Sequence, residues 1–120
     1  MDRFLVIDGD RTASEKLGLA CLERGVGVVM VENVCEGVRT LLTASVSLIV
    51  VDAALLRLSA AEHATLFERV APGVPVVVVV RPDAPLDVRV GFELLGFRVL
   101  TRPVTVEDLV EKTVGTACGR

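Results

Sequence analysis

The apolar residues of this chain gather in five short runs, and the segments between the runs have the length of helices. Each run is four or five residues long and consists mostly of Val, Ile and Leu, which is typical of strands buried on both faces of a sheet. We expect strands at 4–7, 28–31, 47–51, 76–80 and 98–101. Five strands alternating with five helices predict a parallel sheet covered on both faces, the three-layer α/β/α class.

The expected helix starts carry capping signals. In four segments a side chain that accepts hydrogen bonds is followed three residues later by an acid, as in a capping box. These pairs are Thr12 with Glu15, Asn33 with Glu36, Ser59 with Glu62, and Thr105 with Asp108. Asp83, shortly before Pro85, is the expected start of the remaining helix. Gly25 and Gly96 follow helical segments, where a left-handed residue commonly ends a helix.

Composition narrows the class of protein. The chain has 120 residues, which fits one domain, 1–120. Hydrophobic residues make up 52% and charged residues 24%, and the net charge is -3. This composition excludes a disordered chain and a nucleic-acid-coating protein. The longest apolar run, at 74–80, is far shorter than the roughly 20 residues of a membrane helix. Acids in the first ten residues interrupt any signal peptide, so we expect a cytoplasmic protein. The three cysteines lack metal-ligand spacing and are interpreted as packed helix residues rather than redox sensors: Cys21, Cys35 and Cys118.

Charged residues follow four of the five expected strands. Asp8 and Asp10 follow the first strand, Asp52 ends the third, Arg81 follows the fourth and Arg102 follows the fifth. In open parallel sheets, ligands and reactive groups gather beyond the carboxyl ends of the strands. If the strand order is 2-1-3-4-5, these acids and arginines converge at one edge of the sheet.

The order of these residues resembles that of the receiver domains of bacterial two-component response regulators, in an atypical, pseudo-receiver form. The resemblance covers essentially the whole chain: an acid-rich end to the first strand, Asp52 at the end of the third, Pro75 opening the fourth, and Arg102-Pro103 after the fifth. It implies a five-stranded, flavodoxin-like (receiver-like) sheet of order 2-1-3-4-5. It also implies a signalling module in a phosphorelay rather than an enzyme.

The resemblance implies roles for the charged residues. Asp52 takes the position that accepts a phosphoryl group from a histidine kinase, and Asp8 matches the first of two acids that hold Mg²⁺. Gly9 stands where the second acid is usual, which leaves Asp10 as a displaced substitute, so we expect Mg²⁺ to bind only weakly. Arg102 replaces the lysine that pairs with the phosphoryl group. A bidentate ion pair between Arg102 and Asp52 would keep the Asp52 carboxylate from reacting.

Two positions that relay phosphorylation in the family are altered. Val80 stands where the resemblance implies a Thr or Ser hydroxyl, and Val99 stands where family members often carry an aromatic switch residue. Valine offers nothing to a phosphate oxygen, and its side chain is stiff at χ1. We therefore expect that phosphorylation of Asp52 would not shift the protein surface in the usual way.

The resemblance also implies a partner face formed by the fourth helix, fifth strand and fifth helix. It carries both signs of charge: Arg89, Arg98, Glu107, Asp108 and Glu111. Partners would be a histidine kinase or a downstream output protein or domain, and a homodimer through this face is a hypothesis. We expect no direct contact with nucleic acid or membrane.

Several alternatives remain open from the residues alone. The position of Asp52 is explained equally well by a purely structural buried ion pair and by a carboxylate that accepts a phosphoryl group. Asp10 is better explained as a loop acid near a helix start than as a metal ligand. His63, the only histidine, is predicted to lie on the surface. The first interpretation is an atypical receiver with a degenerate phosphorylation site that acts mainly through protein–protein interaction. The alternatives are a receiver phosphorylated on Asp52, or a flavodoxin-like domain with a small-ligand pocket at the same strand ends.

Overall fold

The structure is a computed structural model and describes residues 2–111. Five parallel strands form one sheet in the order β2-β1-β3-β4-β5, as the sequence predicted. The strands are β1 (Arg3–Ile7), β2 (Gly27–Val31), β3 (Leu48–Asp52), β4 (Val76–Val80) and β5 (Arg98–Thr101). The helices are α1 (Arg11–Glu23), α2 (Val34–Thr43), α3 (Ala60–Val70) and α4 (Leu86–Leu94), with a short 3₁₀ turn, η1 (Ala53–Leu55), after β3. A further helical stretch covers 106–111.

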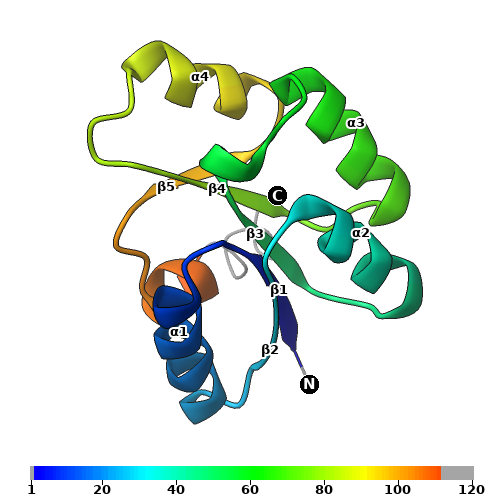
Figure 1. The fold of residues 1–120 in the computed structure, drawn as a ribbon, viewed down its shortest axis with the longest axis vertical. Helices are drawn as coiled ribbons and strands as arrows, with labels where there is room; N and C mark the ends of the chain where they lie inside the picture. The colour runs from blue at the N-terminus through cyan, green and yellow to red at the C-terminus, as the bar shows by residue number, and fades with distance from the viewer. Residues whose placement is uncertain (1, 112–120) are drawn as a thin grey trace.

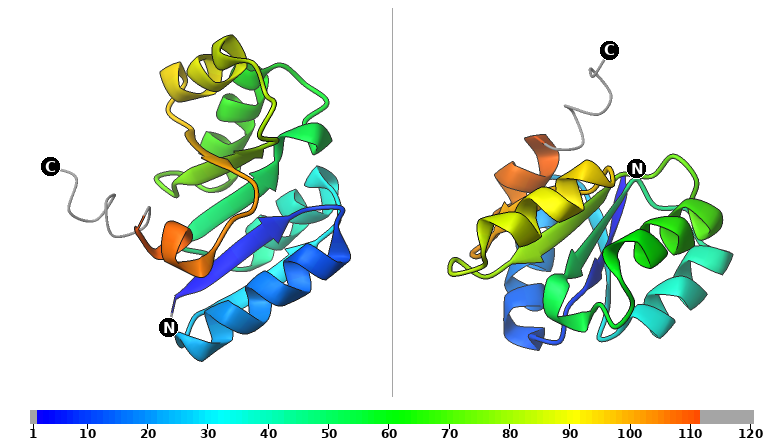
Figure 2. Two further views of the ribbon diagram at one scale, coloured as in Figure 1. Left: turned by 90° about the vertical axis from the view of Figure 1, so that its left-hand side faces the viewer. Right: turned by 90° about the horizontal axis from the view of Figure 1, so that it is seen from above.

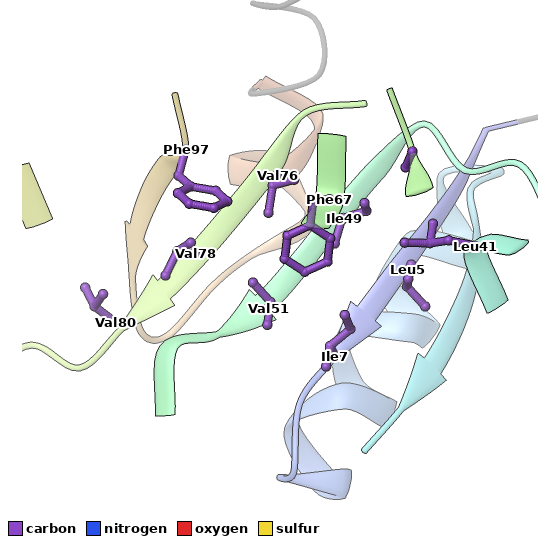
Figure 3. Close-up of a cluster of buried hydrophobic side chains, with 11 residues drawn as sticks. Leu5, Ile7, Leu41, Ile49, Val51, Phe67, Val76, Val78, Val80 and Phe97 are labelled. Carbon is purple, nitrogen blue, oxygen red and sulfur yellow. The ribbon is translucent and has the colours of Figure 1, made fainter. Parts of the chain in front are cut away.

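Helices cover both faces of the sheet (Figures 1 and 2), with α1 and the stretch 106–111 on one side and α2, α3 and α4 on the other. Side chains along a strand alternate between the two faces. Leu5 and Ile7 of β1 therefore lie in the core with Phe67 of α3 (Figure 3), whereas Phe4 and Val6 lie in the core on the α1 side. This two-sided burial explains why the strands are almost uninterrupted apolar runs.

Three of the predicted helix starts are confirmed. The side chain of Asn33 accepts a hydrogen bond from the Glu36 backbone N–H at 2.9 Å, and Ser59 forms a complete capping box with Glu62. Thr105 and Asp108 also exchange two hydrogen bonds of 3.2 Å. Two left-handed glycines end helices as expected: Gly25 with φ 77° and Gly96 with φ 93°.

Two predicted helix starts are wrong. Asp10, rather than Thr12, caps α1, because its carboxylate accepts a hydrogen bond from the Ala13 N–H at 3.1 Å and the helix already includes Thr12. Pro85, without a side-chain hydrogen bond, precedes α4. Asp83 instead lies 3.4 Å from Arg81 in an exposed ion pair.

His63 is not on the surface as predicted, because its side of α3 faces the core and its exposed fraction is 2%. Its Nε2 accepts a hydrogen bond of 3.0 Å from the Leu58 N–H, and its ring stacks on Phe67 with 6.2 Å between centroids. Cys21 is packed in α1 as predicted, but Cys35 is exposed. Cys118 lies outside the described residues. Among residues 2–111, every helix is too short or too polar to cross a membrane.

Candidate functional site

One guanidinium nitrogen joins two acids at the carboxyl end of the sheet. Arg102 follows β5, and its Nη2 lies 2.8 Å from Oδ2 of Asp8 and 2.9 Å from Oδ2 of Asp52. The Arg102 N–H donates to the Val80 carbonyl oxygen at 3.0 Å, which holds the start of this loop against the end of β4. All three charged side chains are largely buried, with exposed fractions of 27% for Arg102, 12% for Asp8 and 20% for Asp52.

The second oxygen of each carboxylate is held by the backbone. Oδ1 of Asp8 accepts from the Asp10 N–H at 2.8 Å, and Oδ1 of Asp52 accepts from the Ala54 N–H at 3.0 Å. The pair of Arg102 with Asp52 is therefore not the bidentate pair that the sequence suggested, since only one Asp52 oxygen faces the guanidinium. Instead a single nitrogen serves two acids, and the cluster of Asp8, Asp52 and Arg102 has a net charge of about -1 when all three groups are ionised.

The cluster stabilises the charged form of Arg102. Burial by itself lowers the pKa of the guanidinium, but the hydrogen bond and charge of Asp8, followed by the charge and hydrogen bond of Asp52, outweigh burial and raise that pKa. The side chain therefore stays cationic at any pH at which the protein is folded. A permanent positive charge lies between the two carboxylates.

The oxygen donors of the cluster meet only part of what a magnesium ion requires. Asp8 and Asp52 supply hard carboxylate oxygens, the ligands that Mg²⁺ prefers, but Gly9 supplies no side chain. Asp10 points its carboxylate to the start of α1. Within residues 2–111, no group of three or more His, Cys, Asp or Glu side chains is arranged to hold a metal ion. Because Arg102 lies between the two acids, the donor set as arranged does not fit Mg²⁺ unless that guanidinium moves away.

The two valines at the expected switch positions are packed in the core. Val80, at the end of β4, is 3% exposed and belongs to the cluster shown in Figure 3, and Val99 of β5 is half-buried against the same cluster. This layer of the core also contains an aromatic pair that the sequence analysis did not single out. Phe92 of α4 and Phe97 before β5 pack edge to face, with 5.8 Å between ring centroids.

Arg81 does not join the cluster, contrary to the expectation that both arginines converge with the acids. A tight turn follows β4, in which the Ala84 N–H donates to the Arg81 carbonyl oxygen at 3.0 Å. The Arg81 side chain is 78% exposed and, among residues 2–111, forms its ion pair with Asp83 alone. The turn carries the arginine into solvent immediately after the strand ends.

Two charged residues of the predicted partner face already interact with other residues of the same chain. Glu107 forms an ion pair of 2.6 Å with Arg24, which directly follows α1, and the Asp108 carboxylate accepts a hydrogen bond from the Thr105 N–H. The other three members are the half-buried Arg89 and Arg98 and the exposed Glu111.

The sequence reasoning missed a second feature of this face, its exposed apolar side chains. Five lie within or just after α4: Leu86 (74% exposed), Val88 (41%), Val90 (40%), Leu94 (82%) and Leu95 (42%). The signal was available, because the segment 86–95 carries apolar residues all round the helix.

Solved structures share the fold. No model of a known protein family matches the chain. The beryllofluoride-activated NtrC4 receiver domain dimer superposes with a TM-score of 0.82 at 19% identity, over 97% of this chain and 96% of that one. A response regulator from Burkholderia pseudomallei, solved with a phosphorylated aspartic acid, a calcium ion and citrate, gives a TM-score of 0.81 at 21% identity, over 99% of this chain and 71% of that one.

A curated relative has a closer sequence. The transcriptional regulatory protein GlrR of Escherichia coli K12 is 30% identical over 111 residues, which are 90% of this chain and 24% of that protein. The chain is a response-regulator receiver domain. This receiver domain spans about a quarter of the length of the curated relatives it matches. In this domain Arg102 lies between Asp8 and Asp52, Gly9 follows Asp8, and positions 80 and 99 are valines.

Proposed function

We propose that this receiver domain acts in two-component signalling mainly through protein–protein interaction, with a phospho-acceptor position that its own arginine keeps closed. The observation that carries the proposal is the contact of one Arg102 nitrogen with both Asp8, at 2.8 Å, and Asp52, at 2.9 Å. An intramolecular cation at this place neutralises the acceptor without any ligand. The domain then stays in one state whether or not a phosphoryl donor is present.

Chemistry at Asp52 would require the cluster to open. Aspartyl phosphorylation begins with a free carboxylate oxygen that attacks phosphorus, and a cation must offset the repulsion between two anions. Here Oδ2 of Asp52 is bound to Arg102 and Oδ1 to the Ala54 N–H. Mg²⁺ would have to displace the guanidinium, so its binding is weak in this proposal. Val80 would leave the phosphoryl oxygens without a hydroxyl donor.

The interaction surface in this proposal is the α4 side of the domain. Monomeric soluble proteins rarely expose large contiguous apolar areas, and such areas commonly mark protein interfaces. The exposed side chains of Leu86 and Leu94, together with the three others in and after α4, provide such an area. A histidine kinase, an output protein or domain, or a second copy of this chain are the partners that we propose for it.

The test is labelling with acetyl phosphate and Mg²⁺, followed by intact-protein mass spectrometry. Wild type is compared with a triple variant, Gly9→Asp, Val80→Thr and Arg102→Lys, which restores the acid, the hydroxyl and the lysine. Gly9 can take a side chain, because a Cβ added there meets no atom within 4 Å. We expect the variant to label at least about tenfold faster, equivalent to about 1.4 kcal/mol of barrier. Asp52→Asn in each background is the control for labelling elsewhere.

The alternative is a working phospho-accepting receiver, which Asp52 at the end of β3 with Asp8 beside it also supports. Wild type labelling as fast as the restored variant would establish this alternative and overturn the proposal. Amide NMR spectra recorded with and without beryllofluoride and Mg²⁺ give a second readout. Large shifts that spread from Asp52 to α4 would show that the signal still reaches the partner face.

A further inference from the structure

A cavity of about 840 Å³ lies between α1 and the segment 102–107 that follows β5. Small-molecule sites in proteins typically measure about 300–1,000 Å³ and are lined mostly by apolar groups with a few polar ones. The cavity lies over the α1 face of the sheet, and one end of it reaches Asp8 and Arg102 at the carboxyl edge, where open α/β sheets bind their ligands. Its size and place are those of a ligand site.

The floor of the cavity is apolar and so are the central parts of both walls, while charged side chains also line the walls: Lys16, Glu23, Arg24 and Glu107. Side chains from the three central strands form the floor: Val6, Val50 and Val79. One wall comes from α1, through Ala13, Leu17 and Ala20, and the opposite wall comes from Pro103, Val104 and Val106. Small side chains on α1 leave the space that larger ones would fill. None of the four phenylalanines lines it, so a flavin would find no aromatic ring for stacking.

One end of the cavity carries polar groups with unused hydrogen-bonding capacity. Ser14 is 4% exposed, and its buried Oγ has no partner among the described residues. Arg102, which lines the same cavity, uses only Nη2 for its two acids, so within residues 2–111 its Nε and Nη1 donate to no acceptor. A buried hydroxyl without a partner costs about 1–3 kcal/mol, which a bound acceptor would recover. Both groups would donate to the same end of a ligand.

The charge at this end selects against anions. Asp8 and Arg102 line this end with Asp10, and Arg102 also pairs with Asp52 behind them. Over the whole cavity, four acids (Asp8, Asp10, Glu23 and Glu107) face three bases (Lys16, Arg24 and Arg102), which leaves about one negative charge. A phosphate or carboxylate would be repelled, whereas a carbonyl or ether oxygen could accept from Arg102 and Ser14 without a charge penalty.

We propose that this cavity binds an uncharged, mainly apolar small molecule that carries a hydrogen-bond acceptor at one end. The site adjoins the charge cluster through Arg102 but does not require Asp52 to be inert, so it stands independently of the proposed function. A second cavity, of about 450 Å³, also borders Ser14, but acids such as Glu32 and Glu36 form half of its lining residues, which does not suit an apolar ligand.

The test uses prodan, a neutral naphthalene ketone whose emission shifts to the blue in apolar surroundings. We expect saturable, blue-shifted binding to the full chain. The anionic naphthalene probe 1-anilinonaphthalene-8-sulfonate should bind at least about tenfold more weakly, because it meets the negative end of the cavity. Ser14→Ala should weaken prodan binding about three- to tenfold through the lost hydroxyl donor. Prodan-induced amide NMR shifts should centre on α1 and 103–106.

Matched variants separate this cavity from the other apolar surface of the domain. Ala20 lines only the larger cavity, so Ala20→Phe should reduce prodan binding at least about tenfold by filling it. Leu94→Gln, in the exposed area of α4, should leave binding unchanged. Circular dichroism checks that each variant folds, and Ala13→Leu replaces Ala20→Phe if the latter does not. The absence of saturable prodan binding, or binding lost in Leu94→Gln but kept in the cavity-filling variant, would overturn the proposal.

Discussion

Arg102 and Asp52 lie 2.9 Å apart although their strands, β5 and β3, are separated in the sheet by β4. The loop after β5 folds back over the end of β4, and the same guanidinium continues to Asp8 on β1. One side chain thus ties together three of the five strands at their carboxyl ends.

Replacing Arg102 should destabilise the domain. Arg102→Met keeps much of the side-chain length but leaves Asp8 and Asp52 close together with no cation between them. Breaking a buried ion pair from one side costs about 3–5 kcal/mol, and because this cluster is partly solvated we expect about 1–3 kcal/mol. Urea unfolding followed by far-UV circular dichroism at pH 7 measures the change in the free energy of unfolding.

Arg81→Met is the matched control for that substitution. Its ion pair with Asp83 is 3.4 Å long, and both side chains are more than 70% exposed (78% and 75%), so solvent screens it. We expect no measurable change in stability. An Arg102→Met effect no larger than that of Arg81→Met would mean that the cluster does not hold the sheet edge together.

The domain should lose stability in mild acid because of His63. Burial lowers the pKa of its imidazole below the ordinary value of 6.5, and the charge of Glu62 offsets burial only in part. The unfolded chain then binds a proton that the folded chain does not, so the stabilisation is complete above about pH 6.5 and declines as the pH falls below it. Between pH 7.5 and 5.5 we expect a loss of up to about 1 kcal/mol from this residue.

His63→Gln separates this effect from the titration of carboxylates. A glutamine oxygen can still accept from the Leu58 N–H, but it does not titrate. Urea unfolding at pH 7.5 and 5.5 should show a smaller decrease in the variant than in wild type. Equal decreases would assign the acid sensitivity to other groups.

Replacing two helix glycines by alanine should change the stability of the domain in opposite directions. A Cβ at Gly37 in α2 would lie 2.6 Å from Cδ1 of Ile7, which is fully buried, whereas a Cβ at Gly91 in α4 meets no atom within 4 Å. Alanine gains about 1 kcal/mol of helix propensity at either position, but overpacking costs about 1–3 kcal/mol. We therefore expect Gly37→Ala to destabilise by about 1 kcal/mol and Gly91→Ala to stabilise by up to that amount. Thermal unfolding of both variants gives the signs directly, and stabilisation by Gly37→Ala would contradict the close contact between α2 and β1.

The apolar area on α4 should make the domain self-associate. Leu86 and Leu94 are 74% and 82% exposed, so replacing both with glutamine should lower the association constant at least about tenfold. Sedimentation equilibrium measures it. Leu19→Gln with Leu22→Gln, on the equally exposed face of α1, is the matched control and should change nothing. A wild-type chain that stays monomeric at the highest soluble concentration would limit this face to other partners.

Most of the fold was predictable because its signals are local. The strands are buried on both faces, so each appears in the sequence as a dense apolar run, and capping pairs marked three helix starts correctly. Asp10 was missed as a cap because Thr12, two residues later, is also a residue type that caps helices, and the sequence pattern alone does not distinguish the two. The surface position predicted for His63 was wrong, because His63 lies four residues before Phe67, one helical turn away, and shares its buried side of α3.

The site was predictable only in part because it depends on long-range geometry. Opposite charges at the carboxyl ends of strands in one sheet indicated that Arg102, Asp52 and Asp8 lie close together. The sequence could not show that one nitrogen serves both acids, since this depends on the Ala54 N–H occupying the other Asp52 oxygen. Nor could it show the cavity, which arises from the spacing between α1 and the segment 102–107 rather than from any periodic pattern.

Asp10 joins the charge cluster to α1. Its backbone N–H donates to Asp8 at 2.8 Å, while its carboxylate accepts from Ala13 in the first turn of the helix. A shift of the Asp8 carboxylate, caused by a cation or by release of Arg102, would therefore pull on the first turn of α1, which is also a wall of the cavity. The residue that the family pattern suggested as a spare metal ligand is thus hydrogen-bonded both to the charge cluster and to the wall of the cavity.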